Sequence, residues 1–143
     1  MADLRVMGHS LRAIRVLLFL VVVSASGVAI SEASAQEEVP LGSALRKELF
    51  ELARPKIEQT AKQSVRFQGS MKQLNGWAFF TGTLVDAAGA VIPVGPAESG
   101  DTAILWTQRN GKWSVVEAAT GFTDVIYLDW SEKHKAPAAL LGN

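Results

Sequence analysis

Four side chains near the C-terminus could carry acid–base chemistry: Asp124, Asp129, Glu132 and His134. General acid–base catalysis needs two titrating groups within hydrogen-bond reach of each other or of the substrate. On a helix, Asp129 and Glu132 lie three residues apart and can meet, whereas Asp124 and Asp129, five residues apart, face different ways. The alternative is that Asp124 complements a helix dipole and the rest form a solvated face with His134 as a terminal cation. We favour this alternative.

Nucleophilic and metal chemistry find little support in the sequence. There is no cysteine, which excludes disulfides and thiolate ligands, and outside the leader described below only His134 could act as a base. The Gly-x-Ser-x-Gly motif of serine hydrolases and the glycine-rich phosphate loops are absent. The sequence therefore predicts no cofactor and no metal. A small hydrolase or isomerase that uses Asp124, Asp129 or His134 remains the enzymatic alternative.

Aromatic residues offer a second kind of functional surface, because exposed Trp and Tyr stack on sugars, peptides and protein partners. The chain holds four Trp. The alternative is that about three of the four belong to the core, since they lie in apolar strands or on an apolar helix face. Our binding candidates combine aromatic and charged residues: Trp77, Phe80, Trp106, Trp113, Tyr127, Trp130, Asp124, Asp129 and His134.

The charges of the chain balance, with 14 Lys+Arg against 14 Asp+Glu. This balance argues against nucleic acid as a partner, because nucleic-acid binders show a basic excess. The distribution is uneven: residues 54–72 hold five bases and one acid, and residues 86–132 hold seven acids and two bases. Such asymmetry steers charged partners to one end of a molecule. A solvent-exposed strand face beside a solvent-exposed helix explains the uneven charge distribution equally well, and we favour that explanation.

The first 35 residues read as a secretory signal peptide. Arginines precede an apolar run over residues 16–23, and Ala33-Ser34-Ala35 fits the cleavage pattern, with Gln36 as the first mature residue. The alternative is a retained anchor. Residues 16–31 are uncharged, which is shorter than the about 20 apolar residues that a spanning helix needs. We therefore expect export to the periplasm or beyond, with membrane contact only through the leader, and a single domain over residues 36–143.

The exported part should begin with a helix. Ser43 is a suitable N-cap for a helix to about Ala53, and Pro55 should end or kink it, with Ile57 carried inward by a second short helix. The expected apolar face consists of Leu45, Leu49 and Leu52.

Beyond Val65 the apolar period changes from 3.6 to two, which indicates strands. Asn75-Gly76 and Asn110-Gly111 are strong hairpin signals. We expect strands over residues 65–72, 77–85, 102–108 and 112–119, with a further short strand over 90–94. Alternation should put Ala78, Phe80 and Leu84 opposite Trp77 and Phe79, Ile104 and Trp106 opposite Leu105, and Trp113 and Val115 opposite Val116.

The chain should end with a helix capped by Thr123 and stopped by Pro137, with Val125, Ile126, Leu128 and Trp130 on its apolar face. The predicted fold class is therefore α+β: an N-terminal helix, a curved antiparallel sheet of four or five strands, and a C-terminal helix. We expect the helices to pack on one face of the sheet. A cystatin-like layout is an analogy in shape.

Several short motifs resemble small uncharacterised exported proteins of Gram-negative bacteria. They are Gly76-Trp77-Ala78-Phe79, residues 111–116, and residues 121–125 with Leu128-Asp129-Trp130 and Ala136-Pro137. This chain has Phe122 where that group has Pro. The resemblance implies periplasmic placement and brings no activity with it.

The leading hypothesis is a non-enzymatic periplasmic module that binds a protein, a peptide or an envelope component. Its basis is the lack of catalytic motifs together with the surplus of aromatic residues. A homodimer formed through an open sheet face is a further hypothesis, because apolar strands need two covers.

The predicted leader is directly testable. In protein expressed from the full sequence in bacteria, the mass of the purified chain should correspond to residues 36–143. Recovery of all the protein in the membrane at full-length mass would contradict the prediction.

Overall fold

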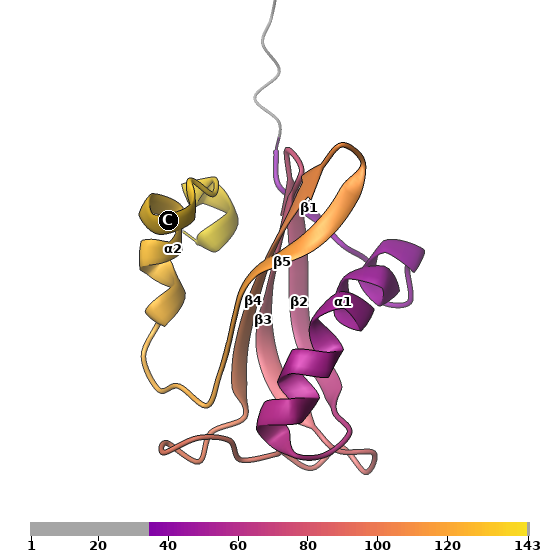
Figure 1. The fold of residues 1–143 in the computed structure, drawn as a ribbon, viewed down its shortest axis with the longest axis vertical. Helices are drawn as coiled ribbons and strands as arrows, with labels where there is room; N and C mark the ends of the chain where they lie inside the picture. Colours follow the sequence, from indigo (N-terminus) through magenta and orange to yellow (C-terminus); the bar gives the residue numbers. More distant parts are fainter. Residues whose placement is uncertain (1–34, 143) are drawn as a thin grey trace, which may run out of the picture. The chain divides into compact units, whose positions relative to one another are not determined.

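The computed structural model describes residues 35–142, so the predicted leader lies outside the described residues except for Ala35 (Figure 1). The predicted α+β class is confirmed: the sheet has five antiparallel strands, a long helix precedes the four main strands, and short helices follow them. The elements are β1 (Glu37–Glu38), α1 (Ala44–Ala61), β2 (Arg66–Leu74), β3 (Trp77–Val85), β4 (Asp101–Arg109), β5 (Lys112–Thr120), the 3₁₀ helix η1 (Ile126–Asp129), α2 (Trp130–His134) and the 3₁₀ helix η2 (Ala138–Leu141).

The strands follow one another in the sheet in the order β1-β2-β3-β4-β5, each antiparallel to its neighbour. Both predicted Asn-Gly turns are present, with positive φ at Asn75, Gly76, Asn110 and Gly111. A two-residue hairpin turn of this kind matches the twist of its strands. The predicted strand over 90–94 is wrong, since this segment forms only single bridges, such as Val85 with Val91.

Helix α1 begins at the predicted cap, where Ser43 Oγ accepts a hydrogen bond from the backbone N of Arg46 at 3.2 Å. The predicted end near Ala53 is wrong, because the helix continues through Pro55 to Ala61. Pro55 lies on the exposed side, where water can hydrate the carbonyl that loses its partner. The buried stripe is Arg46, Leu49, Phe50, Ala53 and Ile57, whereas the predicted core residue Leu52 is 43% exposed.

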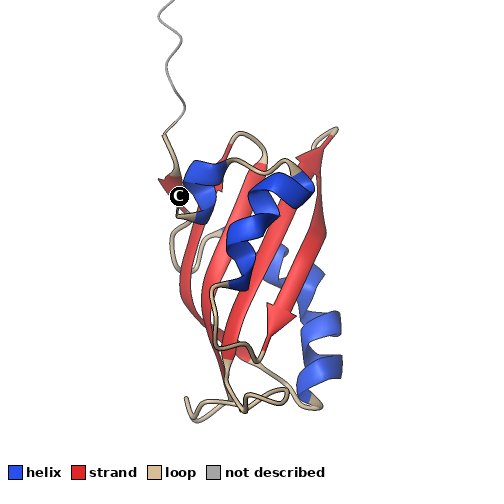
Figure 2. Cartoon of the chain, turned by 90° about the vertical axis from the view of Figure 1, so that its left-hand side faces the viewer, coloured by secondary structure: helices blue, strands red, loops and turns tan. Residues whose placement is uncertain are grey.

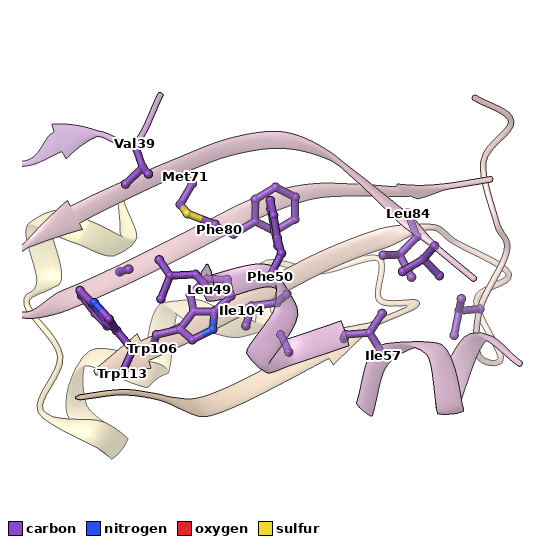
Figure 3. Close-up of a cluster of buried hydrophobic side chains, with 14 of the residues drawn as sticks. Val39, Leu49, Phe50, Ile57, Met71, Phe80, Leu84, Ile104, Trp106 and Trp113 are labelled. Carbon is purple, nitrogen blue, oxygen red and sulfur yellow. The ribbon is translucent and has the colours of Figure 1, made fainter. Parts of the chain in front are cut away.

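The sheet is covered on both faces, so the expectation of helices on one face is wrong (Figures 1 and 2). Helix α1 packs on one face, where Phe50 lies close to Phe80 and Trp106 (Figure 3). The ring of Phe50 also stacks on that of Phe67, with ring centres 4.2 Å apart. The segment from η1 to η2 packs on the other face, through Trp130, Ala136, Leu140 and Leu141. The predicted alternation of side chains in β3, β4 and β5 is confirmed by the membership of these two clusters.

A β-bulge interrupts this alternation in β5. Leu105 pairs with Glu117 and its neighbour Trp106 pairs with Val115, so Val116 is the extra residue. A bulge re-aims the side chains that follow it. Strict alternation would direct Glu117 toward α1, whereas in the structure it contacts Lys133 and His134 at α2.

The C-terminal segment is less helical than expected. Thr123 does not cap a helix, and a 3₁₀ turn starts at Ile126 and leads into the five residues of α2. Val125, Ile126 and Leu128 are exposed rather than core. A helix gains most of its stability from a buried apolar face, and these three side chains provide none. No helix within residues 35–142 is long and apolar enough to cross a membrane.

Two arginines of α1 cap the edge of the sheet that β2 forms. Arg46 is 5% exposed and donates to the backbone oxygens of Val39 and Gly69, at 3.2 and 2.7 Å. Its guanidinium also lies 5.2 Å from the ring centre of Phe50. Arg54 donates to the oxygen of Val65 at 2.6 Å. These bonds occupy carbonyls in and beside β1 and β2, on the side of the sheet that would otherwise be open to pairing with another chain.

Replacing Arg46 should destabilise the fold strongly. Arg46→Ala leaves two backbone acceptors without donors and opens space beside Phe50, which should cost roughly 2–4 kcal/mol of unfolding free energy. The exposed neighbour Lys47 is the matched control, and Lys47→Ala should change stability by less than about 0.5 kcal/mol. Urea denaturation followed by Trp fluorescence measures both. Equal stability of the two variants would contradict the role of Arg46.

Candidate binding site

Four of the nine predicted binding residues are core residues. Phe80 and Trp106 have no exposed surface, and Trp113 and Trp130 are 7% and 2% exposed. A side chain without accessible surface cannot stack on a ligand from solvent, so we no longer count these four as binding candidates. Trp77 and Tyr127 are half-buried and remain accessible.

The structure does not bring Asp124, Asp129 and His134 together. His134 Nε2 forms a close contact with Glu117 Oε2, and Lys133 Nζ donates to the same carboxylate at 3.0 Å. Asp129 is exposed, and Asp124 lines a cavity that includes neither Asp129 nor His134. The enzymatic alternative that grouped these residues therefore lacks a common site.

Glu117 is the partner of His134 and Lys133, and the sequence did not point to it. Its side chain faces α2 only because of the bulge at Val116, and no local sequence signal marked that bulge. Burial by itself raises the pKa of Glu117, but hydrogen bonds from His134 and Lys133 outweigh it and hold the pKa below its ordinary value. The carboxylate thus fastens α2 to the sheet.

An open surface cavity of about 320 Å³ lies between strands β3 and β4 and the segment that follows β5. This volume falls at the lower end of the range typical of small-molecule sites. We name it the Asp101–Asp124 pocket. Its lining consists of Thr81, Gly82, Thr83, Asp101, Thr102, Phe122, Thr123, Asp124, Val125 and Tyr127.

Strand register explains the polar floor of the Asp101–Asp124 pocket. Thr83 pairs with Asp101 across β3 and β4, and Thr81 pairs with Ser70 across β2 and β3. Paired residues point to the same face of a sheet. The face that carries Phe79 and Leu105 under α2 therefore becomes polar toward the far end of the same strands, and the apolar cover stops there.

The wall of the pocket begins at Gly121, directly after β5. Gly121 has φ +72°, and its backbone N donates to Asp101 O at 2.9 Å. A Cβ at this position would lie 2.2 Å from the carbonyl oxygen of Val94. Only glycine fits both constraints. Gly121 thereby sets the direction in which residues 122–125 leave the sheet and pass over the pocket.

Polar groups of the pocket are available to a ligand. Among residues 35–142, no salt bridge includes Asp101 or Asp124. Thr102 is buried and its hydroxyl donates to Gly100 O at 3.1 Å, whereas Thr81 and Thr83 are half-exposed. Within the described part of the chain, no three His, Asp or Glu residues gather as a metal site requires.

A second cavity of about 150 Å³ adjoins the first, because Thr81 and Tyr127 line both. Its other walls mix polar and apolar groups, with Ser70 and Lys72 of β2 beside Phe79, Leu140 and Leu141. The two cavities together give a polar mouth beside a smaller recess of mixed lining.

Comparison of the chain with protein-family models, with curated proteins and with solved structures finds no match in any of the three.

The contacts of Glu117 with His134 and Lys133 should make the free energy of unfolding depend on pH. Because the pKa of Glu117 is lowered in the fold, its contribution is present above the ordinary carboxyl value of 4.5 and is lost as the pH falls through the lower folded value. Glu117→Gln should therefore be less stable than the natural chain at neutral pH, by about 1 kcal/mol or less since the pair is partly exposed. In acid, the unfolding free energies of Glu117→Gln and of the natural chain should become equal.

The control is Glu132→Gln, because Glu132 is an exposed carboxylate of the same short helix. Urea titrations at several pH values measure the difference in unfolding free energy. A difference between the natural chain and Glu117→Gln that stays constant from neutral pH into acid would refute the assignment.

Proposed function

We propose that this chain is an exported, periplasmic, non-enzymatic binding module that holds its ligand in the Asp101–Asp124 pocket. The leader pattern of residues 1–35 and the resemblance to exported proteins support the placement. The observation that carries the binding function is a cavity of about 320 Å³ whose carboxylates take part in no salt bridge among the described residues.

The composition of the pocket favours binding over catalysis. Binding sites combine apolar or aromatic walls with a few convergent polar groups, and Phe122 and Tyr127 lie here beside Thr81 and Thr83. Acid–base catalysis by two carboxylates relies on environments that set them apart, whereas Asp101 and Asp124 are both exposed. His134, the remaining base candidate, is engaged by Glu117.

The structure also narrows how a partner would attach. The homodimer hypothesis needs an open sheet face, and Trp130, Leu140 and Leu141 already cover part of the face opposite α1. The pocket beside this cover is therefore the surface that we assign to binding.

A ligand screen tests this function. In ¹H–¹⁵N NMR spectra of the purified chain, at least one class among amines, sugars, organic acids and short peptides should shift the resonances of Thr83, Asp101 and residues 122–127. Thr83→Leu removes a hydroxyl and fills the mouth, which should weaken that ligand about tenfold. Thr60→Leu, at an exposed position on α1, should not. A screen in which no class shifts these resonances would exclude the pocket as the binding site.

A further inference from the structure

We infer that the ligand of the Asp101–Asp124 pocket is an organic monocation, an ammonium or guanidinium group on an apolar stem. This inference rests on the proposed binding function and names the chemistry that the pocket selects. The cation would lie between the carboxylates and the aromatic rings, and the stem would extend past Tyr127 into the adjoining recess.

The residues that line the Asp101–Asp124 pocket indicate the sign of the ligand's charge. The pocket contains the carboxylates of Asp101 and Asp124 and no Lys, Arg or His. Neither carboxylate is part of a salt bridge among residues 35–142. An entering cation gains two anionic partners, whereas an entering anion meets repulsion, and this difference provides specificity.

The aromatic wall favours an organic cation over a bare metal ion. Phe122 and Tyr127 both line the pocket, with ring centres 6.3 Å apart and planes at 71°. Ring faces attract ammonium and guanidinium groups most strongly where water is partly excluded. Hydroxyls of Thr81 and Thr83 add acceptors for the N–H groups of such a cation.

The adjoining recess accounts for the stem and for the single charge. The recess offers a methylene chain or a ring the half-buried ring of Tyr127 and the narrow exposed edges of Phe79, Leu140 and Leu141, which are 5%, 1% and 2% exposed. Lys72 lies on the wall of the same recess. A second cationic group at the far end of the stem would therefore meet a like charge. The pocket and its recess together select one cationic end and one uncharged end.

Matched probes distinguish these features. Hexylamine, hexanol, hexanoate and hexane diamine share a six-carbon stem and differ in the charge at its ends. In NMR titrations of the purified chain, hexylamine should give saturable shifts at Thr83, Asp101, Asp124 and Tyr127. Hexanol and hexanoate should bind about tenfold more weakly or not at all, since they lack a charge-assisted hydrogen bond. Hexane diamine should bind more weakly than hexylamine.

Substitution of single carboxylates tests where the cationic group binds. Asp124→Asn and Asp101→Asn should each weaken hexylamine about tenfold, because they keep the side-chain shape and remove one charge. Asp129→Asn is the control, since Asp129 is an exposed carboxylate five residues from Asp124 and outside the pocket. It should leave the affinity unchanged. Unshifted resonances of the α1 core in each variant show that the fold is intact.

The cationic group could belong to a free amine or to a lysine side chain of a peptide, and a comparison of two probes distinguishes these sources. Tighter binding of Nα-acetyl-lysine amide than of hexylamine identifies a peptide side chain, and the reverse identifies a free amine. Both support the cation. If hexanol or hexanoate binds the pocket as well as hexylamine does, the inference is wrong although the binding function holds. The inference is also wrong if no cationic probe shifts the resonances of the pocket residues while another class of ligand in the wider screen does. If no ligand of any class shifts these resonances, the proposed binding function itself is wrong.

Discussion

Strands β3 and β4 carry apolar side chains on both faces, and this constraint organises the rest of the molecule. Phe80, Ile104 and Trp106 require one cover, and Phe79 and Leu105 require another. Helix α1, with 18 residues, supplies the first. The second cover is only a chain of short helical turns, and it leaves part of its face uncovered. The Asp101–Asp124 pocket lies beside that shorter cover, so the pocket is a direct result of unequal coverage.

Each cover is held by a charged side chain that bonds across to the sheet. On one side, Arg46 donates to Val39 O and Gly69 O. On the other, Glu117 accepts from Lys133 and contacts His134. The two fastenings differ in strength because Arg46 is buried and bonded to neutral carbonyls, whereas the Glu117 cluster is partly open to water. The cover beside the pocket is therefore the more loosely held of the two.

The fold was predictable where local chemistry is decisive. Asn75-Gly76 and Asn110-Gly111 set both hairpins, and the period of two assigned Phe79 and Phe80 to opposite faces. Features that depend on tertiary contacts were not predicted from the sequence. Pro55 stays within α1 because the packing of Ile57 continues the buried stripe. Glu117 faces α2 because of one inserted residue, which no local pattern marks. The pocket joins residues of distant segments, so among its lining residues only Asp124 and Tyr127 were candidates from the sequence.

The simple strand order has a consequence for how the chain folds. Strands β2 to β5 each pair with the next strand in sequence, so these hairpins can form before the distant strand β1 joins the edge of the sheet. Folding rates rise as the average sequence separation of contacts falls. This sheet therefore avoids the slow search that strand crossovers impose. If the chain is exported as we propose, rapid closure of successive hairpins shortens the time during which apolar strands are exposed to proteases and to one another.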